Sequence, residues 1–454
     1  MRTLLGVAAI VWAAPLFGQT ALPIHSKTLD NGLEIVVIEN RSVPLVTIEL
    51  DVKNGAYTET AEYDGLSHLY EHMFFKANRT IPNQEAYLER LNELGAAWNG
   101  TTSSERVNYY VTIGVDSLRP ALQFMEDAIR YPLFLEDELV RERPVVLGEY
   151  DRAESNPFFH LGRAIDTLLW TPEYWSRKNV IGDREVLSTT PPEKMRTIQE
   201  RFYIPNNTAL ILSGDIGPDE GFALGEEVFG DWPQGADPFA TAVPDPPPLA
   251  ATRAIVVEQP VNTVTIRVDW QGPSVVGEPG STYVADVLIP ILSNPASRFQ
   301  KALVDTGLAF GASFSYATMA HVGPISISAQ TTPEKALDLH RAILAEVGKM
   351  AEPGYITEEE LAAARNQVAV NQTYARERAS SLAHTVGYWW AVASLDYYLS
   401  YVPNLQAVTP DEIAAFTQRY MLGKPHVSGA LISAEARASV DLDAEDFLAQ
   451  EVTL

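Results

Sequence analysis

Cysteine is absent from this chain of 454 residues. Its absence excludes a disulfide framework and a lipid-modified N-terminal cysteine, so packing must hold the fold together. Basic residues are also scarce, because 33 Lys and Arg stand against 59 Asp and Glu, which gives a formal net charge of −26. This charge repels nucleic acid and anionic membrane surfaces and attracts cationic peptides, although it can equally serve solubility. The composition therefore argues against a nucleic-acid-binding protein.

Nucleotide-binding signatures and long apolar runs are nearly absent too. No glycine-rich phosphate loop or dinucleotide fingerprint stands between a predicted strand and a predicted helix, so we expect no nucleotide cofactor. The one long apolar run, residues 4–17, follows Arg2 and is short for a membrane span. We predict a signal peptide at residues 1–20, no membrane span after its removal, and a periplasmic or extracellular protein. A retained N-terminal anchor is the alternative.

The length of the chain predicts two domains, because one compact core rarely grows to this size. A proline-rich stretch without hydrophobic periodicity lies near the middle of the sequence and is typical of an extended linker. We place this linker at residues 237–252. The N-terminal domain is then residues 21–236 and the C-terminal domain is residues 253–454.

The two halves share a pattern of strands and helices, which indicates an internal repeat. Each half opens with two strands of alternating polarity and closes with a helix that runs through a proline into an apolar strand. The predicted strands are residues 33–39, 45–52, 109–113 and 208–213 in the first half and 254–258, 263–270 and 427–433 in the second. Helices are predicted at residues 84–94, 117–130, 136–153, 191–202, 333–350 and 357–377. This pattern predicts an α+β fold with two homologous half-domains, each a mainly antiparallel sheet packed with helices.

The segment that points to chemistry contains two of the 8 histidines of the chain. His68 and His72 are four residues apart in a predicted helix, so both side chains can reach one metal ion. Glu71 lies on nearly the same face, where its carboxylate can accept a proton from a metal-bound water. This is the inverted H-x-x-E-H arrangement of metallopeptidases. We predict that His68 and His72 bind zinc and that Glu71 is the general base, the alternative being two unrelated histidines at the surface or core edge.

A catalytic zinc normally has three protein ligands, so one is still missing. The predicted helix around residues 135–150 offers several carboxylates. Among them, Glu142 and Glu149 are seven residues apart, which is two turns along one helix face. Spacing alone does not choose between them.

These residues resemble the pitrilysin and insulysin family of zinc peptidases, which includes mitochondrial processing peptidase. The resemblance also rests on Leu-Asp-Asn-Gly-Leu at residues 29–33 and on Asn99-Gly100-Thr101 before a strand. It implies that Glu149 is the third ligand of one Zn²⁺ and that Glu142 supports the site from behind. It further implies that the two half-domains face each other across a chamber and that peptide substrate pairs with a sheet edge at Asn99 and Gly100.

One departure from the family concerns an Arg and a Tyr that hold the substrate carbonyl in the transition state. Their positions are occupied here by Leu303 or Val304 and by Phe310. Loss of such donors costs on the order of 100-fold in turnover. The resemblance therefore implies a homologous partner subunit that carries both donors, as a heterodimer, with a homodimer as the other arrangement. Alternatively, Tyr316 or His321 takes over, or the donors are dispensable.

Together, these features predict a secreted zinc metallopeptidase that hydrolyses short or unfolded peptides. The alternative is a catalytically weak peptide-binding or assembly subunit with the same fold.

Overall fold

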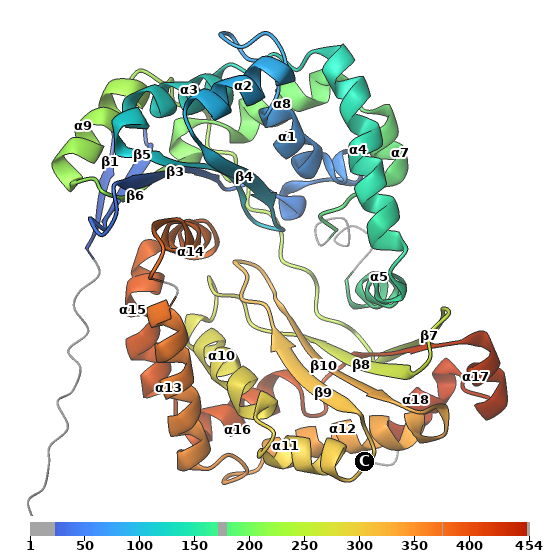
Figure 1. Cartoon of the computed structure of the whole chain (residues 1–454). Coiled ribbons are helices and arrows are strands. Elements are labelled where there is room, and N and C mark those ends of the chain that lie inside the picture. The colour runs from blue at the N-terminus through green and yellow to red at the C-terminus, as the bar shows by residue number, and fades with distance from the viewer. Residues whose placement is uncertain (1–22, 171–178, 375, 452–454) are drawn as a thin grey trace, which may run out of the picture.

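The structure is a computed structural model that describes residues 23–170, 179–374 and 376–451. The predicted signal peptide, residues 1–20, lies outside the described residues. Within the described part of the chain, no helix is both long enough and apolar enough to cross a membrane. The described residues form two halves that face each other, each with one sheet and a set of helices (Figure 1).

The N-terminal half is built on a six-stranded sheet with the order β1-β2-β6-β3-β5-β4. Its strands are β1 (Ile24–Thr28), β2 (Glu34–Glu39), β3 (Leu45–Val52), β4 (Ala97–Thr102), β5 (Val107–Gly114) and β6 (Thr208–Gly214). Only β2 and β6 pair in parallel; the other four pairings are antiparallel. At one edge, β4 pairs with β5 and with no other strand of the described residues, so its other side is available for pairing with another strand.

Helices cover the outer face of this sheet (Figure 1). They are α1 (Leu66–Phe74), α2 (Gln84–Glu93), α3 (Leu118–Arg130), α4 (Glu136–Glu154), α7 (Arg184–Thr189), α8 (Pro192–Phe202) and α9 (Pro218–Phe229). A further helix of this half, α5 (Pro157–Leu169), lies away from this face. Alternation along β3 explains the packing, since Ile48 and Leu50 belong to the core shared with these helices. Glu49 and Asp51 point to the opposite face, where they are also fully buried.

The C-terminal half is built on a five-stranded sheet with the order β7-β11-β8-β10-β9. Its strands are β7 (Arg253–Glu258), β8 (Val264–Gln271), β9 (Gly311–Tyr316), β10 (Pro324–Thr331) and β11 (Val427–Ile432). Its helices are α10 (Pro279–Ser293), α11 (Arg298–Gln300), α12 (Ala336–Met350), α13 (Glu358–Tyr374), α14 (Ala379–Val392), α15 (Leu395–Ala407), α16 (Pro410–Tyr420), α17 (Ala434–Val440) and α18 (Ala444–Glu451).

Apart from β1, the two sheets have the same topology. Strands β2, β6, β3, β5 and β4 correspond in order to β7, β11, β8, β10 and β9, and the one parallel pair falls at the same place in both sheets. The predicted α+β fold with two homologous, mainly antiparallel half-domains is therefore confirmed. Residues 237–252 contain no helix or strand, and the predicted domain boundaries stay a prediction. The six predicted helices are confirmed to within a few residues at each end.

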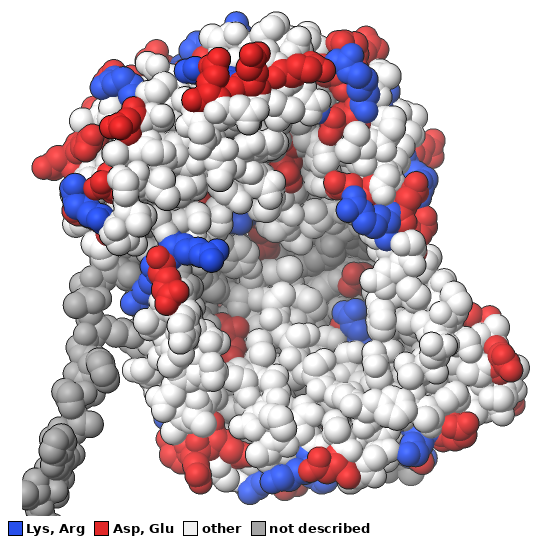
Figure 2. Space-filling model, in the orientation of Figure 1, with Lys and Arg blue, Asp and Glu red and all other residues white. Residues whose placement is uncertain are grey.

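Each half lends one helix to the other half, which the sequence did not predict. Helix α14 of the C-terminal half packs on β2 and β6 of the N-terminal sheet through Leu382, Ala383 and Val386. Helix α5 of the N-terminal half packs on β7 and β11 through Leu161 and Ile165. These two helices lie between the sheets in Figure 1, and the surface is hollowed between the halves in Figure 2.

Charged groups are buried where α14 meets the N-terminal sheet. Arg106 lies 3.3 Å from the Asp51 carboxylate, and His384 of α14 lies 2.5 Å from the carboxylate of Glu49. Burial and the nearby Glu49 raise the pKa of Asp51 well above its usual range, against the opposing effect of Arg106. Gly387 lies directly against the Asp51 carboxylate, and a Cβ atom there would collide with it. Glycine is therefore needed at this helix–sheet contact.

We predict that Gly387→Ala destabilises the protein by about 1–3 kcal/mol, because overpacking forces α14 away from the sheet. The matched control is Gly348→Ala in α12, where an added Cβ meets no atom within 4 Å. That change should be neutral or stabilise by up to about 1 kcal/mol, since alanine favours a helix over glycine. Urea unfolding followed by circular dichroism measures both, and equal midpoints for the two variants would contradict the expected contact.

Candidate metal centre

The helix that carries the histidines begins at a buried carboxylate. Gly65 precedes α1 with a φ of 90° and lets the chain turn into the helix. The Glu59 carboxylate accepts hydrogen bonds from the backbone N–H groups of Gly65 at 2.8 Å and Ser67 at 2.6 Å. Burial raises the pKa of Glu59 to about 8, although both N–H groups favour its charged form. This contact fixes the start of α1 and therefore the position of the residues that follow.

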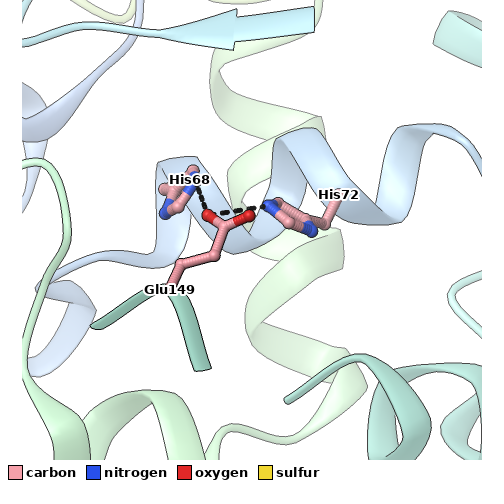
Figure 3. A group of neighbouring side chains, drawn as sticks. All are labelled: His68, His72 and Glu149. Carbon is pink, nitrogen blue, oxygen red and sulfur yellow. Dashed lines mark ion pairs between the residues drawn. The ribbon is translucent and has the colours of Figure 1, made fainter. Parts of the chain in front are cut away.

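Three predicted ligands come together on α1 and α4. The Nε2 atom of His68 lies 3.4 Å from Oε2 of Glu149, and the Nε2 atom of His72 lies 3.7 Å from the same oxygen. One possible ligand atom from each residue lies within 4.8 Å of the others. Figure 3 shows the Glu149 carboxylate facing both imidazole rings. Folding thus brings Glu149 to the histidines, whereas Glu142 lies behind His72.

The donor set fits a zinc ion. Two imidazole nitrogens and one carboxylate oxygen are a known ligand set for catalytic zinc. Bonds of about 2.0–2.1 Å in tetrahedral geometry place two ligand atoms roughly 3.3 Å apart, close to the two nitrogen–oxygen separations above. Burial, with the neighbouring His72, lowers the pKa of His68 to about 4, so its ring is neutral at physiological pH. A neutral imidazole is the form that binds metal.

His72 is oriented from behind by two buried charges. Its Nδ1 atom lies 2.8 Å from Oε1 of Glu142, and the other oxygen of Glu142 pairs with the ammonium of Lys76. Burial opposes the charged form of His72, but the hydrogen bond to Glu142 and the nearby carboxylates outweigh it, so the pKa of His72 is raised. With Nδ1 donating to Glu142, Nε2 is left free to face Glu149. This arrangement matches the supporting role expected for Glu142.

Glu71 lies beside the three-residue group without belonging to it. Its side chain is largely buried, and the hydroxyl of Thr102 donates a hydrogen bond to its Oε2 atom at 2.8 Å. Burial raises the pKa of Glu71, while Thr102 and His72 oppose that change. A carboxylate with a raised pKa next to a metal site is suited to accept and return a proton.

Comparison with known proteins agrees with this geometry. The model of insulinase (peptidase family M16) matches residues 34–170, and the model of the peptidase M16 inactive domain matches residues 191–368. The chain belongs to peptidase family M16. The resemblance to the pitrilysin and insulysin peptidases is thereby confirmed.

M16 relatives match most of the chain. An uncharacterized zinc protease of Rickettsia felis is 25% identical over 368 residues, which are 79% of this chain and 85% of that protein. The structure of a protease from Helicobacter pylori has a TM-score of 0.81 at 20% identity and covers 90% of this chain and 99% of that one. The periplasmic protease PqqL from Escherichia coli has a TM-score of 0.79 at 19% identity, with 95% of this chain matching 50% of PqqL. The two structural likenesses support the fold.

The predicted substrate-binding residues lie on the edge strand of the M16 site. Asn99 pairs with Tyr110 and Gly100 with Tyr109, both on β5. A Cβ atom at Gly100 would lie 3.0 Å from the Glu71 carboxylate, so the glycine is explained by a close approach of that side chain. Next to the strand is an open hollow of about 410 Å³. It is lined by His68, Glu71, His72, Phe75, Lys76, Gln84, Trp98, Asn99, Gly100, Glu142 and Glu149.

The positions expected to carry the two transition-state donors, and the two alternative donors Tyr316 and His321, all lie in the C-terminal half. Leu303 is fully buried, and Phe310 is 62% exposed. The Tyr316 hydroxyl donates to the carbonyl of Pro273 at 3.0 Å, and His321 pairs with Asp245. Tyr316 and His321 thus each have a hydrogen-bond partner within this chain.

Sequence reasoning missed Thr102 and Lys76. Period-two alternation along β4 offers a signal for the first, because Thr102 lies two residues after Gly100 and points to the same face of the sheet. Sequence spacing offers a signal for Lys76, because this residue lies four residues after His72, the distance at which side chains of a helix meet.

We predict that Glu142→Gln weakens zinc binding by roughly 10- to 100-fold, because His72 loses a charged acceptor. The matched control is Glu138→Gln. Glu138 is also a buried glutamate of α4, but it accepts from the backbone N–H groups of Ala77 and Gln84. Chelator competition measures the zinc affinity of both variants, and an equal loss in the control would contradict a specific role for Glu142.

Proposed function

We propose that this chain is an exported zinc-dependent peptidase in which His68, His72 and Glu149 hold one Zn²⁺. The observation that carries the proposal is the convergence of two imidazole Nε2 atoms on one carboxylate, with the buried carboxylate of Glu71 alongside. Zinc proteases among the M16 relatives support the choice of metal. When bound, zinc polarises the substrate carbonyl and lowers the pKa of the attacking water.

The chain's own residues then divide the remaining work. Glu71 accepts the proton of the attacking water and passes it to the departing amine. Glu142 keeps His72 in the tautomer and orientation that present Nε2 to the metal. The open edge of β4 at Asn99 and Gly100 binds the peptide as an added strand, which favours short or unfolded substrates over folded proteins. The hollow between the two halves also favours the entry of short or unfolded peptides over folded proteins (Figure 2).

The missing donors make a second subunit part of the proposal. The positions of the Arg and the Tyr hold apolar residues, and Tyr316 and His321 are engaged in other contacts. A homologous subunit that carries the donors, in a heterodimer, supplies what this chain lacks; a homodimer is the less favoured arrangement because it adds no donor. The match of this chain to half of PqqL supports two such units working together in a relative. The apolar residues 4–17 support export to the periplasm or outside the cell.

A second candidate function follows from the same departure. Without its donors, the chain can bind peptides along β4 as a catalytically weak subunit. The preserved zinc and base residues favour the peptidase, because a binding subunit has no need of Glu71.

We predict that the purified, zinc-loaded chain hydrolyses unstructured fluorogenic peptides slowly by itself. Mixing it with a homologous subunit that carries the Arg and Tyr should raise turnover on the order of 100-fold, because oxyanion stabilisation is restored. As a control, the homologue with both donors replaced should give no increase. Full activity of the chain alone would contradict the divided site, whereas no activity in either sample would favour the binding subunit.

We predict that Glu71→Gln lowers turnover by roughly 100- to 10,000-fold, the usual contribution of a general base. Bound zinc should stay near one per chain, because Glu71 is not part of the ligand group. Glu149→Gln is the comparison variant and should lose zinc as well as turnover. Metal analysis by mass spectrometry separates the two, and zinc loss in Glu71→Gln would show that this residue is a ligand.

A further inference from the structure

The catalytic carboxylate is held by the strand that is expected to bind substrate. Within the described residues, the Glu71 side chain makes one hydrogen bond, which it accepts from the Thr102 hydroxyl at 2.8 Å. Gly100 lies two residues earlier on the same face of β4, and a Cβ atom there would lie 3.0 Å from both Cγ and Oε1 of Glu71. Gly100 and Thr102, two positions on one face of β4, thus both lie against the Glu71 carboxylate.

Thr101, the residue before Thr102, makes a different contact. The hydroxyl of Thr101 points to the opposite face of β4, where it bonds the side chain of Asn108. Asn108 in turn donates to Glu49 in the buried network below α14. Thr101 and Thr102 are therefore two hydroxyls of one strand, of which only Thr102 contacts the candidate active site.

The strand end that carries Thr102 is fastened to the other half of the molecule. The carboxylate of Glu105, in the turn after β4, accepts backbone N–H groups of Ala320 at 2.6 Å and His321 at 3.1 Å, both in the C-terminal half. The next residue, Arg106, donates to the backbone carbonyl of His384 at 2.9 Å. A hydroxyl next to an anchored strand end is a rigid support for a flexible glutamate.

We propose that Thr102 is the positioning residue of Glu71, and that the C-terminal half keeps Thr102 in place through the turn at Glu105. A glutamate side chain without this bond has several rotamers of similar energy, and only some of them direct a carboxylate toward the metal position. The inference deepens the proposed function, because it assigns the orientation of the general base to the edge strand. It also gives the C-terminal half, which supplies no metal ligand, a part in the chemistry.

The test compares Thr102→Val, Thr102→Ser and the matched control Thr101→Val in the full zinc-loaded chain, with the homologous partner present if the wild type needs it. Thr102→Val keeps the shape but removes the donor, so kcat should fall about 10-fold, a part of the 100-fold or more that a general base contributes. KM and bound zinc should stay within twofold of the wild type. Thr102→Ser retains a hydroxyl, so its kcat should stay within about threefold of the wild type. The kcat of Thr101→Val should stay within the same range.

A second measurement does not depend on activity. Crystal structures of the metal-free wild type and of the three variants show where the Glu71 carboxylate lies. It should keep its place in the wild type, in Thr102→Ser and in Thr101→Val, and should adopt another or several rotamers in Thr102→Val.

The proposal is overturned if Glu71 keeps its place in Thr102→Val, if Thr102→Ser loses as much kcat as Thr102→Val, or if Thr101→Val loses equally. A wild type that hydrolyses no peptide, with or without a partner, would refute the peptidase function. The crystal structures would then still decide whether Thr102 positions Glu71.

Discussion

Packing of α4 against α1 is the contact on which the candidate site depends. The histidines lie on α1, and Glu149 lies on α4, 77 residues after His72 in the sequence. Glu142, two helical turns before Glu149 on the same face, bonds His72 and Lys76 and so sets the register of α4 against α1. The contact that orients His72, one candidate ligand, therefore also brings Glu149, the third candidate, to the two histidines.

The two halves of the duplicated fold depend on each other, although the candidate metal ligands all lie in the N-terminal half. Each sheet has one face covered by its own helices, and α14 and α5 cover part of the other face across the junction. Neither half alone buries its full set of apolar residues, because part of each core belongs to a helix of the other half. The C-terminal half also holds the turn after β4 through Glu105 and Arg106. Closure of the fold and the position of the edge strand are thus linked.

Burial raises the pKa of several acids of the N-terminal half, and three of these acids have partners at the junction or at the candidate site. Glu59 accepts the first N–H groups of α1, Asp51 faces Arg106, and Glu71 faces Thr102. Burial of a carboxylate is costly without such partners. The first two acids fix the helix and the junction between the halves, whereas Glu71 lines the hollow beside β4.

The sequence by itself determined the local chemistry. Four-residue spacing on a helix places His68 and His72 on one face. Period-two and helical patterns, with the turn residues between them, located the repeated halves. Both signals can be read from the sequence because they depend only on residues close together in the chain. Spacing left Glu142 and Glu149 open, and only the tertiary structure decided which one faces both rings. The exchange of α14 and α5 and the contact of Thr102 with Glu71 were also decided there. These contacts join residues far apart in the sequence, and no local pattern specifies which surfaces pack together when the chain folds.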